Sequence, residues 1–362
     1  MQPEPPRFPG RLSKVRKKLL TDRLEALLFL DLNNIRYLTG FTGGSGALLL
    51  ADARLVLLVD GRYVTQAREE APQVEIFECR DKMEGIAEIL ATFEAKAVGF
   101  ESAAISFENY GKLKEKIPDV KLESLPNDGS GIRAIKDESE VALLREAAAK
   151  ASETLAAMLD AIRPGVRERD VALELEYRMR QKGAEGVSFP TIVASGVNSA
   201  LPHATPGARK LATGDAVVID FGTVYGGYHS DETCTFFLGC ASSRQKEVYH
   251  VVKEAHDRAL AAVKAGIPCS EIDRIARDRI KEGGLDRFFS HAAGHGVGLD
   301  IHEPPKMTES SKVVLEAGMV ITIEPAVYIP GLWGVRIEDM VLVKNDGCEV
   351  LTKMGKDFTL LY

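Results

Sequence analysis

The sequence predicts a two-domain α/β protein, and three observations lead to that prediction. The first third of the 362 residues alternates short apolar strands with segments of helical spacing. The polar stretch 124–137 then separates this third from the rest of the chain. Beyond it, long helices precede a strand-rich end, and no histidine occurs before residue 203. We therefore expect an α/β domain over residues 1–126 and a second α/β (α+β) domain over residues 127–362.

The first domain should contain alternating strands and helices. Leucine-rich and β-branched runs predict strands at 24–30, 47–50, 55–59, 97–100 and 120–122, and helical spacing predicts helices at 63–70 and 83–94. The polar run 31–34 is expected to form a turn, and Asp52-Ala53 to close a hairpin between the second and third strands. The Gly-rich run 41–46 lacks the Gly-Lys-Ser/Thr ending of a phosphate loop, so we expect no nucleotide site there.

The second domain should open on a long helix. Asp137 and Glu140 have the Asp-x-x-Glu spacing of a capping box, which predicts a helix from that point to about Ile162. Further helices are expected at 168–181, 243–264 and 270–283, with a strand at 188–194 before the β-rich segments.

Composition limits the partners and the compartment. A net charge of −7 and a pI near 5.7 argue against nucleic acid or an anionic membrane surface as partner. No run approaches the roughly 20 apolar residues of a membrane span, and the N-terminus lacks the apolar core of a secretory signal. The five cysteines are scattered and contain no Cys-x-x-Cys, which is typical of free thiols in a reducing cytoplasm. We expect a cytoplasmic protein.

Two aspartates point to a cation. Folding the segment 215–238 about the turn 224–227 predicts that Asp220 lies directly opposite Asp231 on the paired strand. Like charges in that position destabilise a sheet, and unpaired carboxylates are costly to bury among apolar residues. A metal ion between the two side chains would remove both penalties.

Further ligand candidates follow downstream. His291, His295 and His302 lie in the Gly-rich stretch 290–305. Glu324 and Glu338 flank the turn-like segment 330–334, so a second hairpin should bring these two acids together. Four carboxylates and one imidazole carry too much negative charge for one divalent ion and suit a pair of ions.

The order of these residues resembles a known family. Asp, Asp, His, Glu and Glu occur in VVIDFG, HSDETCTF, AGHGVGLDIHE, ITIEPAVY and VRIED, which are similar to the motifs of the pita-bread (M24-type) metallopeptidases, and within them of the Xaa-Pro branch, aminopeptidase P and prolidase. The segment 188–207 also resembles that branch. The resemblance is strong from about residue 130 to the end and looser over residues 10–125, which resemble the creatinase/prolidase-type N-terminal domain.

The resemblance implies a site and its roles. The implied metal ligands are Asp220, Asp231, His295, Glu324 and Glu338, with Glu324 also shuttling a proton. His203 and His302 are the implied catalytic histidines that hydrogen-bond the substrate carbonyl and its oxyanion. The alternative, that each acid caps a turn or pairs with a surface lysine, conflicts with the apolar residues that flank the acids.

Three further residues are expected beside the ligands. His291 lies four residues before His295, but Gly294 and Gly296 argue against a helical histidine pair, so a role in lining the pocket or supporting the ligands is expected. Arg336 is expected to fix a ligand carboxylate by a bidentate pair, the alternative being a surface ion pair. Thr233 shares a strand face with Asp231 and is expected to hydrogen-bond a ligand, although threonine is common in strands for packing alone.

The implied activity is hydrolysis of the bond between an N-terminal residue and proline in small peptides, of the aminopeptidase P type. A prolidase restricted to Xaa-Pro dipeptides is the alternative within the same chemistry, and a non-hydrolytic pita-bread binding protein is the alternative from another class. Ligand hardness favours two Mn²⁺ ions, although Co²⁺, Fe²⁺ or Zn²⁺ can bind such a site. The resemblance also implies a homodimer.

Overall fold

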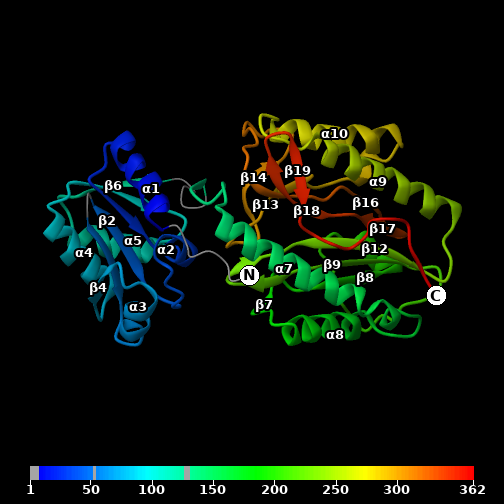
Figure 1. Cartoon of the computed structure of the whole chain (residues 1–362), viewed down its shortest axis with the longest axis horizontal. Helices are drawn as coiled ribbons and strands as arrows, with labels where there is room; N and C mark the ends of the chain where they lie inside the picture. The colour runs from blue at the N-terminus through cyan, green and yellow to red at the C-terminus, as the bar shows by residue number, and fades with distance from the viewer. Residues whose placement is uncertain (1–7, 52–53, 126–130) are drawn as a thin grey trace. The chain divides into compact units, whose positions relative to one another are not determined.

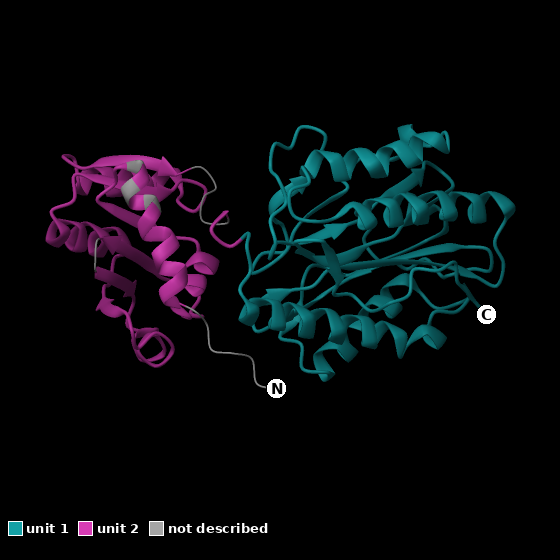
Figure 2. Cartoon of the chain, turned by 45° about the horizontal axis from the view of Figure 1, so that its top comes forward, with its two compact units in different colours: residues 1–4, 134–362 teal, residues 5–133 magenta. Residues whose placement is uncertain are grey.

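The computed structural model describes residues 8–51, 54–125 and 131–362, and the chain divides into two compact units with the boundary between Arg133 and Ala134 (Figure 2). The domain boundary predicted at residue 126 lies outside the described residues, as does the predicted Asp52-Ala53 turn. No helix among the described residues is long and apolar enough to cross a membrane.

The N-terminal unit is built on a mixed six-stranded sheet (Figure 1). The strand order is β4-β3-β2-β1-β5-β6, with β1 (Ala26–Phe29), β2 (Ala47–Ala51), β3 (Arg54–Val59), β4 (Glu75–Glu78), β5 (Ala97–Glu101) and β6 (Lys121–Leu125). The helices are α1 (Phe8–Asp22), α2 (Leu32–Thr39), α3 (Val64–Glu70), α4 (Lys82–Phe93) and α5 (Phe107–Lys116). The predicted β2–β3 hairpin is confirmed, with Leu50 opposite Leu55.

The polar run 31–34 is not the predicted turn. Asp31 instead caps α2, since its side chain accepts hydrogen bonds from the backbone N–H groups of Asn33 and Asn34. Aspartate serves turns and helix N-caps through the same side-chain hydrogen bond, so the short polar run alone could not distinguish them. Ile35 and Leu38 bury one face of the helix and decide the outcome.

The C-terminal unit consists of two halves, each with two helices followed by strands. The first half contains α7 (Glu138–Ala156), α8 (Glu168–Gln181), β7 (Gly186–Val187), β8 (Ile192–Ser195), β9 (Ala216–Phe221), β10 (Thr223–Tyr225), β11 (Tyr228–His229) and β12 (Glu232–Leu238). The second contains α9 (Ser243–Ala262), α10 (Cys269–Glu282), β13 (Gly294–Gly296), β14 (Glu303–Met307), β15 (Val320–Ile323), β16 (Ala326–Ile329), β17 (Trp333–Arg336), β18 (Asp339–Lys344) and β19 (Gly347–Val350), and β20 (Leu360–Leu361) then pairs with β12 of the first half.

Each helix pair covers one side of the strands (Figure 1). Residues of α7 and α8 share a buried apolar cluster with β9 and β12, and residues of α9 and α10 share another with β15 and β18. The predicted capping box is present, because the Asp137 side chain accepts from the Glu140 N–H and the Glu140 side chain from the Asp137 N–H. The helix ends at Ala156 rather than Ile162, and residues 159–161 form a tighter 3₁₀ turn before Pro164.

The register predicted for the aspartate hairpin is wrong. Asp220 lies opposite Thr233, not opposite Asp231. The turn is centred on Gly226 and Gly227, whose φ values of 58° and 79° permit a two-residue turn, so Tyr225 pairs with Tyr228. The partner of Asp220 therefore moves by two residues, and a shift of two keeps the same face of the strand.

Candidate metal centre

The fold brings several predicted ligands together in the C-terminal unit. Asp231, His295 and Glu338 are buried, and each offers one ligand atom within 4.8 Å of the ligand atoms of the other two. His295 Nε2 lies 3.4 Å from Asp231 Oδ2 and 3.6 Å from Glu324 Oε1. These oxygen and imidazole donors converge as ligands of a divalent cation do.

Strand pairing between the two halves places the carboxylates. Thr233 of β12 and Glu338, the residue before β18, form an isolated β-bridge, in which the Glu338 N–H donates to Thr233 O at 3.1 Å. The Thr233 hydroxyl also donates to Glu338 Oε2 at 2.6 Å, so this threonine fixes the orientation of a candidate ligand.

The two glutamates face each other, as the predicted hairpin requires. Ile323 pairs with Asp339 on one side, and Ala326 pairs with Arg336 on the other. Glu324 and Glu338 occupy the matching positions between these two pairs, so the β16–β17 hairpin returns the chain to the site.

His295 is held between close strands. An added Cβ at Gly294 would lie 2.0 Å from Thr322 O, and one at Gly296 would lie 2.3 Å from Pro304 O, so only glycine permits this approach. His295 Nδ1 lies 3.0 Å from Gly296 O. This contact directs the proton to Nδ1 and leaves Nε2 free to act as a ligand towards the acids.

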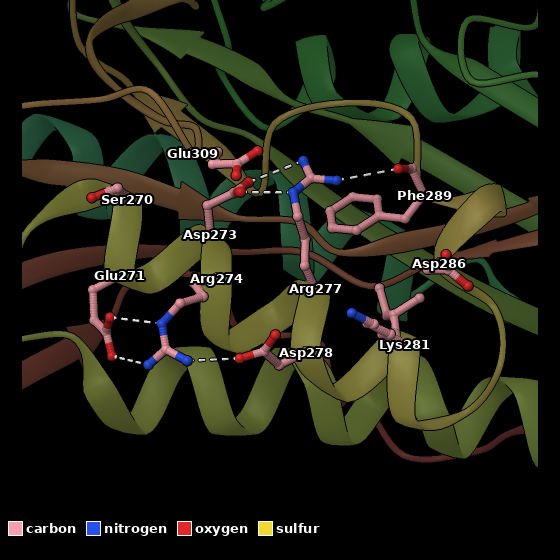
Figure 3. A pocket seen from close by; sticks show the side chains of 11 residues that line it. Ser270, Glu271, Asp273, Arg274, Arg277, Asp278, Lys281, Asp286, Phe289 and Glu309 are labelled. Carbon is pink, nitrogen blue, oxygen red and sulfur yellow. Dashed lines mark hydrogen bonds and ion pairs between the residues drawn. The ribbon is translucent and has the colours of Figure 1, made fainter.

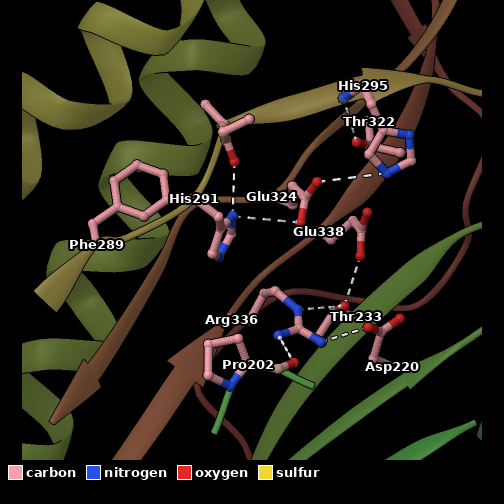
Figure 4. A network of polar contacts seen from close by, with 12 residues as sticks. Pro202, Asp220, Thr233, Phe289, His291, His295, Thr322, Glu324, Arg336 and Glu338 are labelled. Atoms are coloured by element: carbon pink, nitrogen blue, oxygen red, sulfur yellow. Dashed lines mark hydrogen bonds and ion pairs between the residues drawn. The ribbon is translucent and has the colours of Figure 1, made fainter. Parts of the chain in front are cut away.

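Arg336 contacts four groups at the site, and Figure 4 shows three of them, Asp220, Thr233 and Pro202. Its guanidinium hydrogen-bonds Asp220 Oδ2, donates from Nε to the Thr233 hydroxyl at 3.1 Å, and donates from Nη1 to the Tyr328 hydroxyl at 2.6 Å and to Pro202 O at 3.1 Å. Asp220 Oδ1 is buried and has no hydrogen-bond partner among the described residues. A buried carboxylate oxygen without a donor fits a cation.

The electrostatics of the cluster favour a cation. Burial, and then the charges of Asp220 and Glu324, raise the pKa of Asp231 well above its usual range. Burial, and then the Asp231 charge, do the same to the pKa of Glu338. Burial also raises the pKa of Glu324, against the opposing effects of His295 and Arg336. The carboxylates are therefore unfavourable as anions until a positive charge joins them.

The stabilisation of the protein by Mn²⁺ is expected to increase with pH. Since the folded state raises the pKa of Asp231, Glu324 and Glu338 above the values of the unfolded chain, these groups favour folding at low pH, and their contribution is lost as the pH rises through the raised values. Cations bind the deprotonated groups. The gap in melting temperature between Mn²⁺-loaded and metal-free protein should widen from about pH 5 to about pH 8. A gap that stays constant or narrows would contradict this assignment of the cluster.

The other predicted histidines surround the cluster. His291 Nε2 lies 3.1 Å from the Tyr328 hydroxyl and His291 Nδ1 lies 3.9 Å from Glu324 Oε2, and burial lowers the pKa of His291 to about 4, so it is neutral near pH 7. The His302 ring packs edge-on against His295 with centroids 4.5 Å apart. His203 is exposed and follows Pro202, whose carbonyl accepts from Arg336.

Helix α10 anchors the segment that carries His291, and Figure 3 shows Asp273 and Arg277 of this helix beside Phe289. Buried Asp273 accepts from Arg277 Nε at 2.6 Å and from the Ala293 N–H at 3.1 Å. Arg277 also donates to the backbone carbonyls of Phe289 and His291. Both side chains line a cavity of about 430 Å³ that includes none of the predicted site residues.

Sequence reasoning did not identify Tyr328, Asp273 or Arg277. Tyr328 lies four residues after Glu324 in an extended segment, so strand alternation could have indicated that the two share a face. Asp273 and Arg277 lie on a helix, and their i,i+4 spacing predicts a pair with each other but gives no signal for the contacts to residues 289–293.

Two family models match the chain. Residues 142–345 match the model of metallopeptidase family M24, and residues 11–135 match the creatinase/prolidase N-terminal domain. The chain is 37% identical over 350 residues to a protein named Xaa-Pro dipeptidase from Pyrococcus furiosus, covering 96% of this chain and 99% of that one.

Two solved structures are similar throughout. A Bacillus anthracis structure described as Xaa-Pro dipeptidase has a TM-score of 0.95 and 38% identity, covering 98% of this chain and 100% of that one. A Thermotoga maritima structure described as X-Pro aminopeptidase has a TM-score of 0.86 and 34% identity, covering 93% and 98%.

Proposed function

The chain belongs to metallopeptidase family M24, and on that premise we propose that it is a two-metal Xaa-Pro dipeptidase. The dipeptidase alternative is preferred to the predicted aminopeptidase P type, because relatives named Xaa-Pro dipeptidase match at 37% and 38% identity over nearly their whole length. The similarity to the Thermotoga X-Pro aminopeptidase keeps that activity as the second candidate. The binding-protein alternative is set aside, since the chain is a metallopeptidase with all five candidate ligands present.

The observation that carries the proposal is the buried group of Asp231, His295 and Glu338, with Glu324 and Asp220 beside it. These five residues are proposed to hold two divalent ions. Oxygen donors with one imidazole favour Mn²⁺ by hardness, with Co²⁺, Fe²⁺ or Zn²⁺ as possible substitutes. Such ions, when bound, polarise the scissile carbonyl and lower the pKa of water towards neutrality.

The chain itself would move the proton and orient the substrate. Glu324 has a raised pKa and is proposed to accept a proton from the attacking water and deliver it to the proline imide nitrogen, which is a poor leaving group until protonated. His302 and His203 are proposed to donate hydrogen bonds to the carbonyl oxygen as it gains negative charge.

The remaining predicted residues would support these groups. Neutral His291 is proposed to hold Glu324 and Tyr328 in place. Arg336 and Thr233 are proposed to orient Asp220 and Glu338. We also propose a homodimer, as the family resemblance implies. The scattered cysteines support a cytoplasmic location, and the polar stretch 124–137 supports a functional boundary between residues 126 and 127.

The proposal predicts which peptides are hydrolysed. After reconstitution with Mn²⁺, Gly-Pro should be cleaved with a kcat/KM at least about 10²-fold above that of Gly-Pro-Gly-Gly. A dipeptidase must recognise the free C-terminal carboxylate of the proline, which the longer peptide lacks. Chromatographic detection of released glycine measures both reactions, and Gly-Ala serves as the control for the need for proline. Efficient cleavage of the tetrapeptide would establish the aminopeptidase P activity instead. Cleavage of neither Pro peptide would contradict the proposed function.

A further inference from the structure

A second buried group of charges lies behind the candidate metal centre. We call Glu232, Asp339 and Lys356 the back cluster; their side chains are 1%, 8% and 6% exposed. The Lys356 ammonium lies 2.5 Å from Glu232 Oε1 and 3.4 Å from Asp339 Oδ1. One lysine therefore bridges two carboxylates that would otherwise repel each other in a medium of low polarity.

The two carboxylates directly follow candidate metal ligands. Glu232 follows Asp231, and Asp339 follows Glu338. Successive side chains of an extended segment point to opposite faces, and the contacts agree, because Asp231 lies beside His295 whereas Glu232 contacts Lys356. The back cluster and the ligands thus occupy opposite faces of the same two strands, which the Thr233–Glu338 bridge joins.

The back cluster also connects both helix layers. Glu232 Oε2 accepts from the Ser152 hydroxyl of α7 at 2.5 Å. Asp339 Oδ2 lies 3.2 Å from His256 Nε2 of α9, and its Oδ1 accepts from the Thr352 hydroxyl. Elements of both halves therefore meet at Lys356, which lies in the C-terminal segment.

We propose that Lys356 is a positioning residue that sets the spacing of Asp231 and Glu338, and hence the affinity for the metal. This inference rests on the proposed function, because it assumes that these two acids bind the ion. Without the ammonium, Glu232 and Asp339 repel each other, and strands β12 and β18 separate at the bridge that aligns the ligands. Lys356 itself touches neither the ligands nor the substrate-facing histidines in any contact found for it.

The test measures metal affinity separately from turnover. Lys356→Met should weaken Mn²⁺ binding by about 10- to 100-fold, as loss of groups that orient ligands generally does. Competition with a chelating dye gives the affinity. At saturating Mn²⁺ the KM for Gly-Pro should stay near the wild-type value. Adding Glu232→Gln to Lys356→Met removes the repulsion and should recover part of the affinity.

A matched variant separates positioning from general stability. The Tyr249 hydroxyl donates to Lys356 O at 3.1 Å, so Tyr249→Phe loosens the same segment but leaves the ammonium in place. It should lower the melting temperature without changing Mn²⁺ affinity. If Lys356→Met does not fold, Lys356→Gln replaces it with the same expectation.

Two results would distinguish failure of the positioning role of Lys356 from failure of the proposed function. Wild-type Mn²⁺ affinity in a folded Lys356 variant, with only a lower melting temperature, would overturn the positioning role. Failure of the wild-type protein to bind any of Mn²⁺, Co²⁺, Fe²⁺ and Zn²⁺ would overturn the proposed function itself.

Discussion

Replacing Asp231 by Asn is expected to abolish turnover and, at the same time, to raise the melting temperature of the metal-free protein. Turnover should fall because Asp231 is one of three buried groups whose ligand atoms converge within 4.8 Å. Loss of about 10³-fold in kcat/KM or more corresponds to about 4 kcal/mol of transition-state stabilisation. Glu324→Gln should have a similar effect on turnover, since Glu324 is proposed both to bind metal and to move the proton.

The gain in stability follows from charge repulsion. Asp231 is buried, its pKa is raised by burial and then by Asp220 and Glu324, and an amide of the same shape removes an uncompensated charge. A gain of about 1 kcal/mol would raise the melting temperature by about 2–4 °C in a unit of this size. Mn²⁺ should stabilise the wild-type protein but not this variant.

The control is Asp346→Asn, an exposed aspartate in the turn between β18 and β19. It should leave turnover, metal-free melting and the response to Mn²⁺ near the wild-type values. Thermal melts by circular dichroism, with and without Mn²⁺, together with Gly-Pro hydrolysis, provide the comparison. Retained hydrolysis by Asp231→Asn would show that the metal centre is misplaced.

Replacing Arg336 by Met is expected to destabilise the protein and inactivate it. Arg336 is buried and hydrogen-bonds Asp220, Thr233, Tyr328 and Pro202 O. Removing one partner of a buried ion pair costs about 3–5 kcal/mol, because the other charge stays buried without compensation. Turnover should fall as well, since Asp220 loses the group that orients it and the Pro202 carbonyl beside His203 loses its donor.

Two variants test whether the geometry of Arg336 matters. Arg336→Lys keeps the charge but lacks the planar guanidinium that bonds four acceptors at once. It should therefore be more stable than Arg336→Met but less stable than the wild type. Arg145→Met removes a half-exposed ion pair with Glu349 and should cost no more than about 1 kcal/mol. Urea unfolding measures all three free energies. Wild-type stability in Arg336→Met would mean that Asp220 finds another partner in the folded protein.

Local sequence patterns determined much of the fold. The Asp137–Glu140 capping box and the bounds of α8 could be read directly, because helix signals lie within one or two turns of the chain. The β16–β17 hairpin, which brings Glu324 and Glu338 together, followed from a turn-like segment between two apolar strands. Helix α1 was missed, although Leu12, Val15 and Leu19 bury one of its faces at helical spacing.

The order of the five candidate ligands was also readable from the sequence, but their contacts were not. Because the turn is centred on Gly226-Gly227, the residue opposite Asp220 is Thr233 and not the predicted Asp231. The positive φ values that permit this turn are observed only in the folded backbone. Arg336 was expected to hold a ligand carboxylate by a bidentate pair. It contacts Asp220, 116 residues away, but only at Oδ2, because its other donors go to Thr233, Tyr328 and Pro202.

The sequence by itself determined which residue types stand on which strand face, because alternation and apolar flanks are local properties of the chain. The tertiary structure alone decided which of them meet. Thr233 and Glu338 are 105 residues apart, and Glu232 and Lys356 are 124 apart. Such pairings depend on how the two halves pack. A buried polar or charged group without a partner costs free energy, and only the packing determines which partners lie close enough to remove that cost.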